Sequence, residues 1–327
     1  MFKKISQTDD HASPRLSISQ IEEAAKTIDK VFMNTPQYVA ESLSEILGVR
    51  TVVKMEIANP IRCFKGRGAD FVIANLAAGS KVITASAGNL GQAMAYACRR
   101  RGVELTVYAS VNANTLKIER MRALGANVIL HGIDFDAAKI EAKRVANASS
   151  YIMVEDGREQ KLSEGAGSIA VELMCFPEKI DTVLVALGNG AMLGGMAQYI
   201  KAKFPDTEVI GVAATGAPCM EQSWRTNEIV ETEQINTIAD GIGTRIPIPE
   251  ALEDIRVVID DILLVEDDQM IQGMQLAYHH LGVVLEPSGA AGIAALLANP
   301  KRFQGRTVAT ILCGGNLTVE QMSCWLN

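Results

Sequence analysis

The chain has 327 residues, of which 48% are hydrophobic, 21% are charged and 5% are aromatic, and its formal net charge is −7. This length and apolar content predict a compact soluble protein with a large core and two lobes rather than one. The acidic balance, without any cluster of basic and aromatic side chains, argues against a nucleic-acid partner.

The termini, cysteines and histidines exclude several other classes. No apolar run is long enough to cross a bilayer, and the basic start of the chain has no apolar core of a signal peptide behind it. His11, His279 and His280 have no partner at metal-ligand spacing, so no metal site is predicted. The six scattered cysteines favour reduced thiols in a cytoplasmic enzyme over a disulfide framework or zinc site: Cys63, Cys98, Cys175, Cys219, Cys313 and Cys324.

Short β-branched or apolar runs alternate with longer amphipathic stretches, a pattern typical of parallel sheets with helices on both faces. The predicted strands are Lys81–Thr84, Leu105–Ala109, Asn127–Leu130, Thr182–Ala186, Glu208–Ala213 and Thr307–Leu312. The predicted helices are Gly91–Arg101, Asn114–Leu124, Asp136–Ala146, Glu164–Met174, Leu193–Phe204, Asp267–His280 and Ala290–Ala298.

The strand and helix order also predicts the domains. Residues 81–155 form a self-contained β-α-β-α-β pattern, with turn residues at Gly102, Gly125 and Gly132. We expect this small domain to be inserted into a larger one made of residues 1–80 and 156–327. A cleft between two such lobes is the predicted ligand site.

Lys65 is the first chemical candidate along the chain. It lies between Phe64 and Gly66, after an apolar run interrupted by Lys54 and Glu56, and it opens a second apolar stretch. Alone it would be interpreted as a solvated surface charge. At a strand-to-helix junction, however, a lysine withdrawn from water is a usable amine nucleophile for a carbonyl.

Three further segments are candidates for binding an anion or a ring. The run Ser86 to Gln92 precedes a predicted helix and offers a hydroxyl, an amide and backbone N–H groups, with an ordinary N-cap and glycine turn as the alternative. Near the end, Leu285 to Ala290 precedes a helix and Ile311 to Asn316 closes a strand with a glycine turn. Each segment alone is weak evidence for a ligand site. The prediction depends on their occurring together in this order.

The clearest phosphate candidate is Val183 to Met196, a strand followed by a glycine-rich turn and a helix. Glycines let the backbone approach an anion, and a helix N-terminus presents free N–H groups. A tight turn without a ligand remains the alternative. A dinucleotide site fits poorly, because the loop lacks the GxGxxG spacing and the next strand ends in alanines without an acidic residue for a ribose.

In this order of segments the chain resembles the fold-type II pyridoxal-phosphate enzymes, and in particular the serine/threonine dehydratase family that includes serine racemase. The similarity extends over nearly the whole chain. It implies an α/β fold like that of the tryptophan synthase β subunit, with two open twisted parallel-sheet lobes and helices on both faces. The matching motifs are Cys63 to Lys65 with Arg67 to Ala69, Ser86 to Asn89, Gly188 to Ala191, Glu286 to Gly289 and Gly314 to Asn316.

The resemblance implies pyridoxal 5'-phosphate as cofactor and a role for each matched residue. Lys65 would be the catalytic residue that binds the cofactor covalently and moves the Cα proton of the substrate. Cys313 would face the pyridine nitrogen. The other expected cofactor residues are Phe64, Asn89, Gly188, Asn189, Gly190, Ala191, Met192, Gly241 and Glu286. The expected substrate-carboxylate residues are Ser86, Ala87, Gly88, Asn89 and Leu90.

Several positions depart from the family pattern. Ala87 stands where serine racemase has a second acid/base serine, so racemisation is disfavoured while elimination is unaffected. Asn189 and Ala191 replace two glycines of the phosphate loop. Leu90 and Cys63 replace a frequent histidine and a usual serine, and Ala213 replaces a Glu that often binds a metal ion in relatives.

The resulting hypothesis is dehydration and deamination of a small β-hydroxy amino acid, such as threonine or serine, to a 2-oxo acid and ammonia by a homodimer. One alternative is a β-replacement synthase, in which a nucleophile adds to aminoacrylate. Another is a catalytically silent protein that retains the cofactor. Arg62, Arg67 and Arg245 are interpreted as structural cations, with recognition of a second substrate carboxylate by Arg245 as the alternative.

Overall fold

A computed structural model describes residues 14–113 and 115–326 of the chain. The predictions made for the basic N-terminal start and for His11 lie outside the described residues. None of the helices within the described ranges is long and apolar enough to span a membrane.

The larger of two sheets has six strands in the order β1-β2-β10-β7-β8-β9. All neighbouring strands in it run parallel except the edge pair β1 and β2, which is antiparallel. The strands are β1 (Gln37–Val39), β2 (Arg50–Lys54), β7 (Thr182–Ala186), β8 (Glu208–Ala214), β9 (Asp261–Val265) and β10 (Thr307–Ile311). β10 thus lies between β2 and β7, so strands from the first sixth and the last tenth of the chain are neighbours in one sheet.

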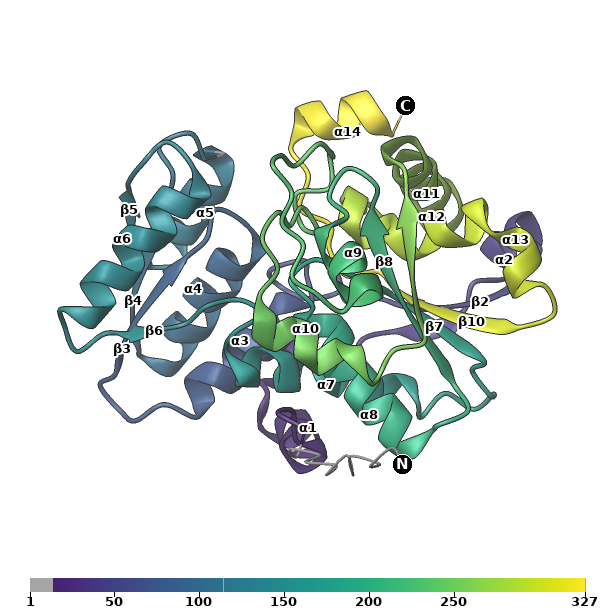
Figure 1. The fold of residues 1–327 in the computed structure, drawn as a ribbon, viewed down its shortest axis with the longest axis horizontal. Helices are drawn as coiled ribbons and strands as arrows, with labels where there is room; N and C mark the ends of the chain where they lie inside the picture. Colours follow the sequence, from purple (N-terminus) through teal and green to yellow (C-terminus); the bar gives the residue numbers. More distant parts are fainter. Residues whose placement is uncertain (1–13, 114, 327) are drawn as a thin grey trace, which may run out of the picture.

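The smaller sheet has four parallel strands in the order β5-β4-β3-β6. They are β3 (Lys81–Ala85), β4 (Glu104–Ala109), β5 (Asn127–Leu130) and β6 (Ile152–Met153). Three helices accompany this sheet: α4 (Asn89–Arg101), α5 (Thr115–Ala123) and α6 (Phe135–Asn147). Figure 1 shows this unit beside the larger sheet and its helices.

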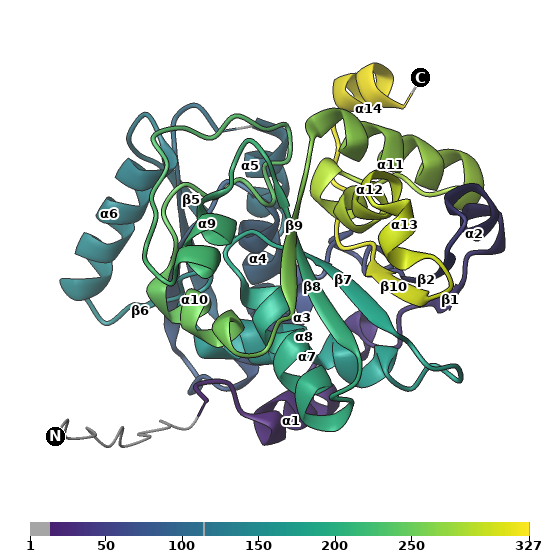
Figure 2. The ribbon, with the colours of Figure 1, turned by 45° about the vertical axis from the view of Figure 1, so that its right-hand side comes forward.

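Helices cover both faces of the larger sheet, with α7 and α8 on one side and α11 and α12 on the other (Figures 1 and 2). The α-helices outside the smaller unit are α1 (Ile18–Thr27), α2 (Glu41–Leu47), α3 (Lys65–Ala74), α7 (Gln160–Leu173), α8 (Ala191–Lys203), α9 (Cys219–Thr226), α10 (Pro249–Arg256), α11 (Asp267–Leu281), α12 (Ala291–Ala298), α13 (Pro300–Phe303) and α14 (Val319–Trp325). Two 3-10 turns, η1 (Lys30–Phe32) and η2 (Pro287–Ala290), complete the described secondary structure.

Helix α3 connects the two units. Its buried residues Phe71 and Val72 belong to the same apolar cluster as Met94 of α4 and Val107 of β4. On another side it packs against α7. The residue that begins α3, Lys65, is therefore held between the units, while a domain division at 80/81 and 155/156 stays a prediction.

All six predicted strands are present, with ends within one residue of those predicted. The predicted helices are present too, although α7 begins four residues earlier than expected and α4 and α8 each begin two residues earlier. Residue Asn114, the predicted start of α5, lies outside the described residues. Strands β1, β2, β6 and β9 were not predicted: β1 and β6 have only three and two residues, β2 begins and ends with a charged residue, and β9 begins with Asp261.

Candidate active site

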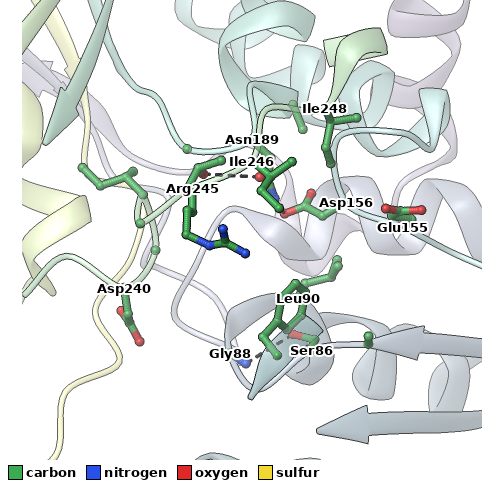
Figure 3. Close-up of a pocket in the computed structure, with 18 of the residues that line it drawn as sticks. Ser86, Gly88, Leu90, Glu155, Asp156, Asn189, Asp240, Arg245, Ile246 and Ile248 are labelled. Carbon is green, nitrogen blue, oxygen red and sulfur yellow. Dashed lines mark hydrogen bonds between the residues drawn. The ribbon is translucent and has the colours of Figure 1, made fainter. Parts of the chain in front are cut away.

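A cleft of about 1140 Å³ is lined by segments from both units. The loops that follow β3, β6 and β7 reach it, as does the long segment between α9 and α10 (Figure 3). The structure brings every predicted site residue to this one cleft: Phe64, Lys65, Ser86, Ala87, Gly88, Asn89, Leu90, Gly188, Asn189, Gly190, Ala191, Met192, Gly241, Glu286 and Cys313.

Lys65 is the first residue of α3, and its amine pairs with a carboxylate that the sequence did not single out. The Nζ atom donates hydrogen bonds to Asp156 Oδ1 at 2.8 Å and Oδ2 at 2.6 Å. The two side chains are 16% and 20% exposed. The Asn189 amide also donates to Asp156 Oδ2, at 3.3 Å. Asp156 follows the two-residue strand β6, and only the rule that parallel strands open onto a cleft at their carboxyl ends could have suggested it.

The N-terminus of α8 is suited to binding an anion. Gly190 is the N-cap residue, with φ +92°, and no side chain caps the helix. Its first backbone N–H groups are therefore free to bind an anion, which the helix dipole also favours. A Cβ atom on Gly188 would lie 2.9 Å from the Gly241 carbonyl oxygen, so only glycine lets these two loops approach so closely.

The loop before α4 is ordered by its own serine. The Ser86 hydroxyl accepts hydrogen bonds from the backbone N–H of Gly88 at 3.2 Å and of Gly91 at 3.0 Å, and Figure 3 shows the first of these. The N-cap residue of α4 is Gly88, which has no side chain of its own, so Ser86 satisfies one N–H of the first turn. This loop presents a second helix N-terminus to the cleft, as a substrate carboxylate requires.

Glu286 is a buried carboxyl that joins three segments. It accepts hydrogen bonds from the Asn89 amide at 2.7 Å, from the Ser288 hydroxyl at 3.0 Å and from the Asn316 backbone N–H at 3.1 Å. The Asn316 amide in turn donates to Asn89 Oδ1 at 2.9 Å. Burial, and next the charge of Asp240, raise the pKa of Glu286 above its usual value.

Cys313 reaches the cleft as a protonated thiol. Burial, followed by the nearby Glu286 carboxyl, strongly raises the pKa of its thiol, and burial raises the pKa of Cys63 to about 12. The thiol donates to the Ser288 carbonyl oxygen at 3.5 Å. The backbone N–H of Phe64 donates to the carbonyl of Cys313 at 3.0 Å, which fixes the cysteine beside the Lys65 segment.

Two of the arginines singled out in the sequence, Arg67 and Arg245, lie in different surroundings. Arg67 is fully buried, with its guanidinium bound to Glu56 and Glu172, so it is a structural cation. Arg245 reaches down into the pocket from its loop (Figure 3) and pairs with Asp136 at 2.9 Å. Within the described ranges no group of three His, Cys, Asp or Glu side chains is arranged to hold a metal ion.

The sequence model of a family described as "Pyridoxal-phosphate dependent enzyme" matches residues 28–314. The chain belongs to this family. Pyridoxal 5'-phosphate is accordingly its cofactor, and the fold-type II architecture predicted from the motifs is confirmed. The cleft fits this cofactor, because it combines a lysine amine, an uncapped helix N-terminus and a loop approach at Gly188 that a Cβ atom would fill.

Individual relatives are similar over most of this chain. The L-threonine ammonia-lyase of Thermotoga maritima is 31% identical over 95% of this chain and 78% of its own length. The L-threonine dehydratase biosynthetic IlvA of Pasteurella multocida is 32% identical over 88% of this chain, which spans only 57% of that relative. The structure of maize serine racemase superposes with a TM-score of 0.90 at 26% identity, covering 95% of this chain and 96% of that one.

Proposed function

We propose that this protein dehydrates and deaminates a small β-hydroxy amino acid, such as threonine or serine, to a 2-oxo acid and ammonia. The observation that carries the proposal is that one cleft collects the Lys65 amine and two helix N-termini with glycine at the N-cap, those of α4 and α8. A substrate carboxylate and a cofactor phosphate are the two anions that these termini would bind. The similarity to L-threonine ammonia-lyase supports the same reaction.

The cofactor residues are proposed from the family resemblance, and their places in the cleft support the proposal. Gly188, Asn189, Gly190, Ala191 and Met192 would hold the phosphate at the first turn of α8. When bound, the cofactor withdraws electrons from the Cα atom of an amino acid attached to it. Phe64, Asn89, Gly241, Glu286 and Cys313 would surround its ring.

The substrate would be held and deprotonated by the chain's own groups. The loop of Ser86, Ala87, Gly88, Asn89 and Leu90 would bind the carboxylate through backbone N–H groups and the Asn89 amide. The Lys65 amine would take the Cα proton. Because Ala87 has no group that could return a proton from the opposite face, elimination is favoured over racemisation.

A protonated thiol at Cys313 would favour loss of a β-substituent over reactions that need a long-lived carbanion at Cα. A neutral thiol stabilises less negative charge at Cα than a carboxylate partner would. A reaction in which proton removal is followed quickly by loss of the β-hydroxyl is best suited to such a site. Assembly as a homodimer, a cytoplasmic location and the small domain 81–155 complete the proposal as predictions from the sequence.

The test is to purify the protein, look for a cofactor absorbance band that borohydride reduction abolishes, and screen β-hydroxy amino acids for 2-oxo acid and ammonia. We expect both products from the wild type and neither from Lys65→Ala, which should also lose the borohydride-sensitive band. Bound cofactor with product formed only when sulfide or an amine is added would favour β-replacement instead. Bound cofactor with no turnover under any condition would favour a silent protein.

A further inference from the structure

Asp156 pairs with the amine that the proposed reaction uses as its base. The Lys65 Nζ atom donates to both oxygens of Asp156, at 2.8 and 2.6 Å, and both side chains are mostly buried. The centre of the Phe64 ring lies 4.9 Å from the same Nζ atom. A carboxylate and an aromatic face both attract a cation. The surroundings of Nζ therefore stabilise positive charge on this atom.

The Asp156 carboxylate is held in place by the turn that carries it and by the loop before α8. The backbone N–H of Glu159 donates to the Glu155 carbonyl oxygen at 2.9 Å and closes the turn. A Cβ atom on Gly157 would lie 3.2 Å from the Cβ atom of Asn189, so the turn and the loop pack closely. The Asn189 amide also donates to Asp156 Oδ2 at 3.3 Å, and Figure 3 shows these two side chains together. A carboxylate fixed in this way needs little reorganisation when a charge forms beside it.

The charge of Asp156 is directed at Lys65 and is not shared with other cations of the cleft. Within the described ranges, Lys65 is the cation that pairs with Asp156. The preceding residue, Glu155, pairs instead with Lys139 and Lys143 of α6. Two adjacent carboxylates thus have separate cationic partners, and that of Asp156 is the amine proposed to react.

We propose that Asp156 is a positioning residue of the reaction: its carboxylate holds the free Lys65 amine in the cleft and stabilises the ammonium that forms when this amine takes the Cα proton. The inference rests on the proposed function, in which the substrate amine displaces the Lys65 amine from the cofactor and leaves it free beside Asp156. Asp156 lies outside the motifs that relate the chain to its family, so the resemblance assigns it no role.

Protons and charges balance in this scheme. The Cα–H bond breaks and an N–H bond forms at Lys65 Nζ, so one positive charge appears beside Asp156. The electron pair left at Cα forms the Cα–Cβ double bond as the Cβ–O bond breaks. The leaving hydroxyl needs one proton to become water, and the Lys65 ammonium holds one. Asp156 stays ionised throughout, as the buried aspartate of a Ser-His-Asp triad does.

The test separates proton removal from elimination. L-alanine has a Cα proton but no β-hydroxyl, so the cofactor-loaded enzyme should exchange this proton with deuterium from heavy water without forming a 2-oxo acid. NMR would follow the exchange, and the absorbance of the bound cofactor would follow the binding of L-alanine. Asp156→Asn should exchange about 100-fold more slowly, the loss typical of removing one preorganised charge-stabilising partner. It should bind L-alanine as tightly as the wild type.

Three further variants complete the comparison. Asp156→Glu keeps the carboxylate and should exchange faster than Asp156→Asn. Asp156→Ala is a second uncharged variant with the same expected loss, and it replaces Asp156→Asn if that variant does not fold. Glu233→Gln removes one charge from an exposed residue of the same cleft and should exchange as fast as the wild type.

Exchange at the wild-type rate in the uncharged variants would overturn the inference. An equal loss in Asp156→Glu or in Glu233→Gln would overturn it too, as would a loss of L-alanine binding as large as the loss of exchange. Each of these would indicate a general effect on charge or structure in place of an action on Lys65. Failure of the proposed function is distinct, because no β-hydroxy amino acid would then yield a 2-oxo acid while exchange into L-alanine still depended on Asp156.

Discussion

The amide of Asn89 donates a 2.7 Å hydrogen bond to the buried carboxyl of Glu286, which lies 197 residues further along the chain. Asn89 begins α4 beside the smaller sheet, whereas Glu286 precedes η2 beside the larger one. The bond therefore joins the two units at the wall of the cleft. It also explains why a carboxyl is buried there, since three donors converge on it.

Glu286 should make stability depend on pH. Because burial raises its pKa in the folded state, the folded protein binds more protons than the unfolded one above about pH 4.5, the ordinary value for glutamate. The contribution of Glu286 to the free energy of unfolding should therefore fall as pH rises from about 4.5 to the pKa of Glu286 in the folded state. The loss should be about 1.4 kcal/mol for each tenfold difference in proton affinity between the folded and unfolded states. Denaturant unfolding at several pH values should show a shallower decline in Glu286→Gln, and equal slopes would contradict the prediction.

Arg67 should be essential to stability. Its buried guanidinium donates to Glu56 at 2.7 and 2.8 Å and to Glu172 at 2.9 Å. Arg67→Ala leaves a buried carboxylate without its cation and should cost about 3–5 kcal/mol of the free energy of unfolding. Arg50→Ala, which breaks the exposed pair with Glu178, is the matched control and should have a much smaller effect. Similar losses in the free energy of unfolding of the two variants would refute the structural role of the Arg67 ion pairs.

The cysteines should differ sharply in reactivity. Thiolate is the reactive form, and burial raises the thiol pKa at four positions, to about 12 at Cys63. Iodoacetamide at about pH 8, followed by mass spectrometry of peptides, should label the exposed pair rapidly and the buried four only after unfolding. Rapid labelling of Cys313 in the folded protein would show that its thiol is not held as described. The exposed pair is Cys175 and Cys324, and the buried four are Cys63, Cys98, Cys219 and Cys313.

Gly188→Ala should weaken cofactor binding. The added Cβ atom would lie 2.9 Å from the Gly241 carbonyl oxygen and 3.2 Å from Ile242 Cα, so the backbone of one loop must move. Overpacking of this kind costs about 1–3 kcal/mol, which corresponds to about a 5–150-fold weaker apparent affinity measured by cofactor titration. Gly194→Ala, further along α8 where the nearest atom is the Asp254 Cβ at 3.3 Å, should retain the wild-type affinity. Equal affinities in both variants would rule out a close approach at Gly188.

The sequence determined the features that depend on neighbours along the chain. A strand, a glycine turn and a helix start are local patterns, so the turn at Gly190 and helix α8 that follows it were both predictable. The alternation of these patterns was enough to predict two layered α/β units. It failed for β6, whose two residues are too few to show any periodicity.

Only the tertiary structure decided which side chains meet. Asp156 reaches Lys65 across 91 residues of sequence, and Arg245 reaches Asp136 across 109. Those pairings depend on the order of strands in each sheet and on how the two units face each other, which no local pattern encodes. The charge of a residue is fixed by its chemistry, but its partner is fixed by the fold. For that reason the sequence could place a lysine in a cofactor cleft, and the fold was needed to reveal the carboxylate beside it.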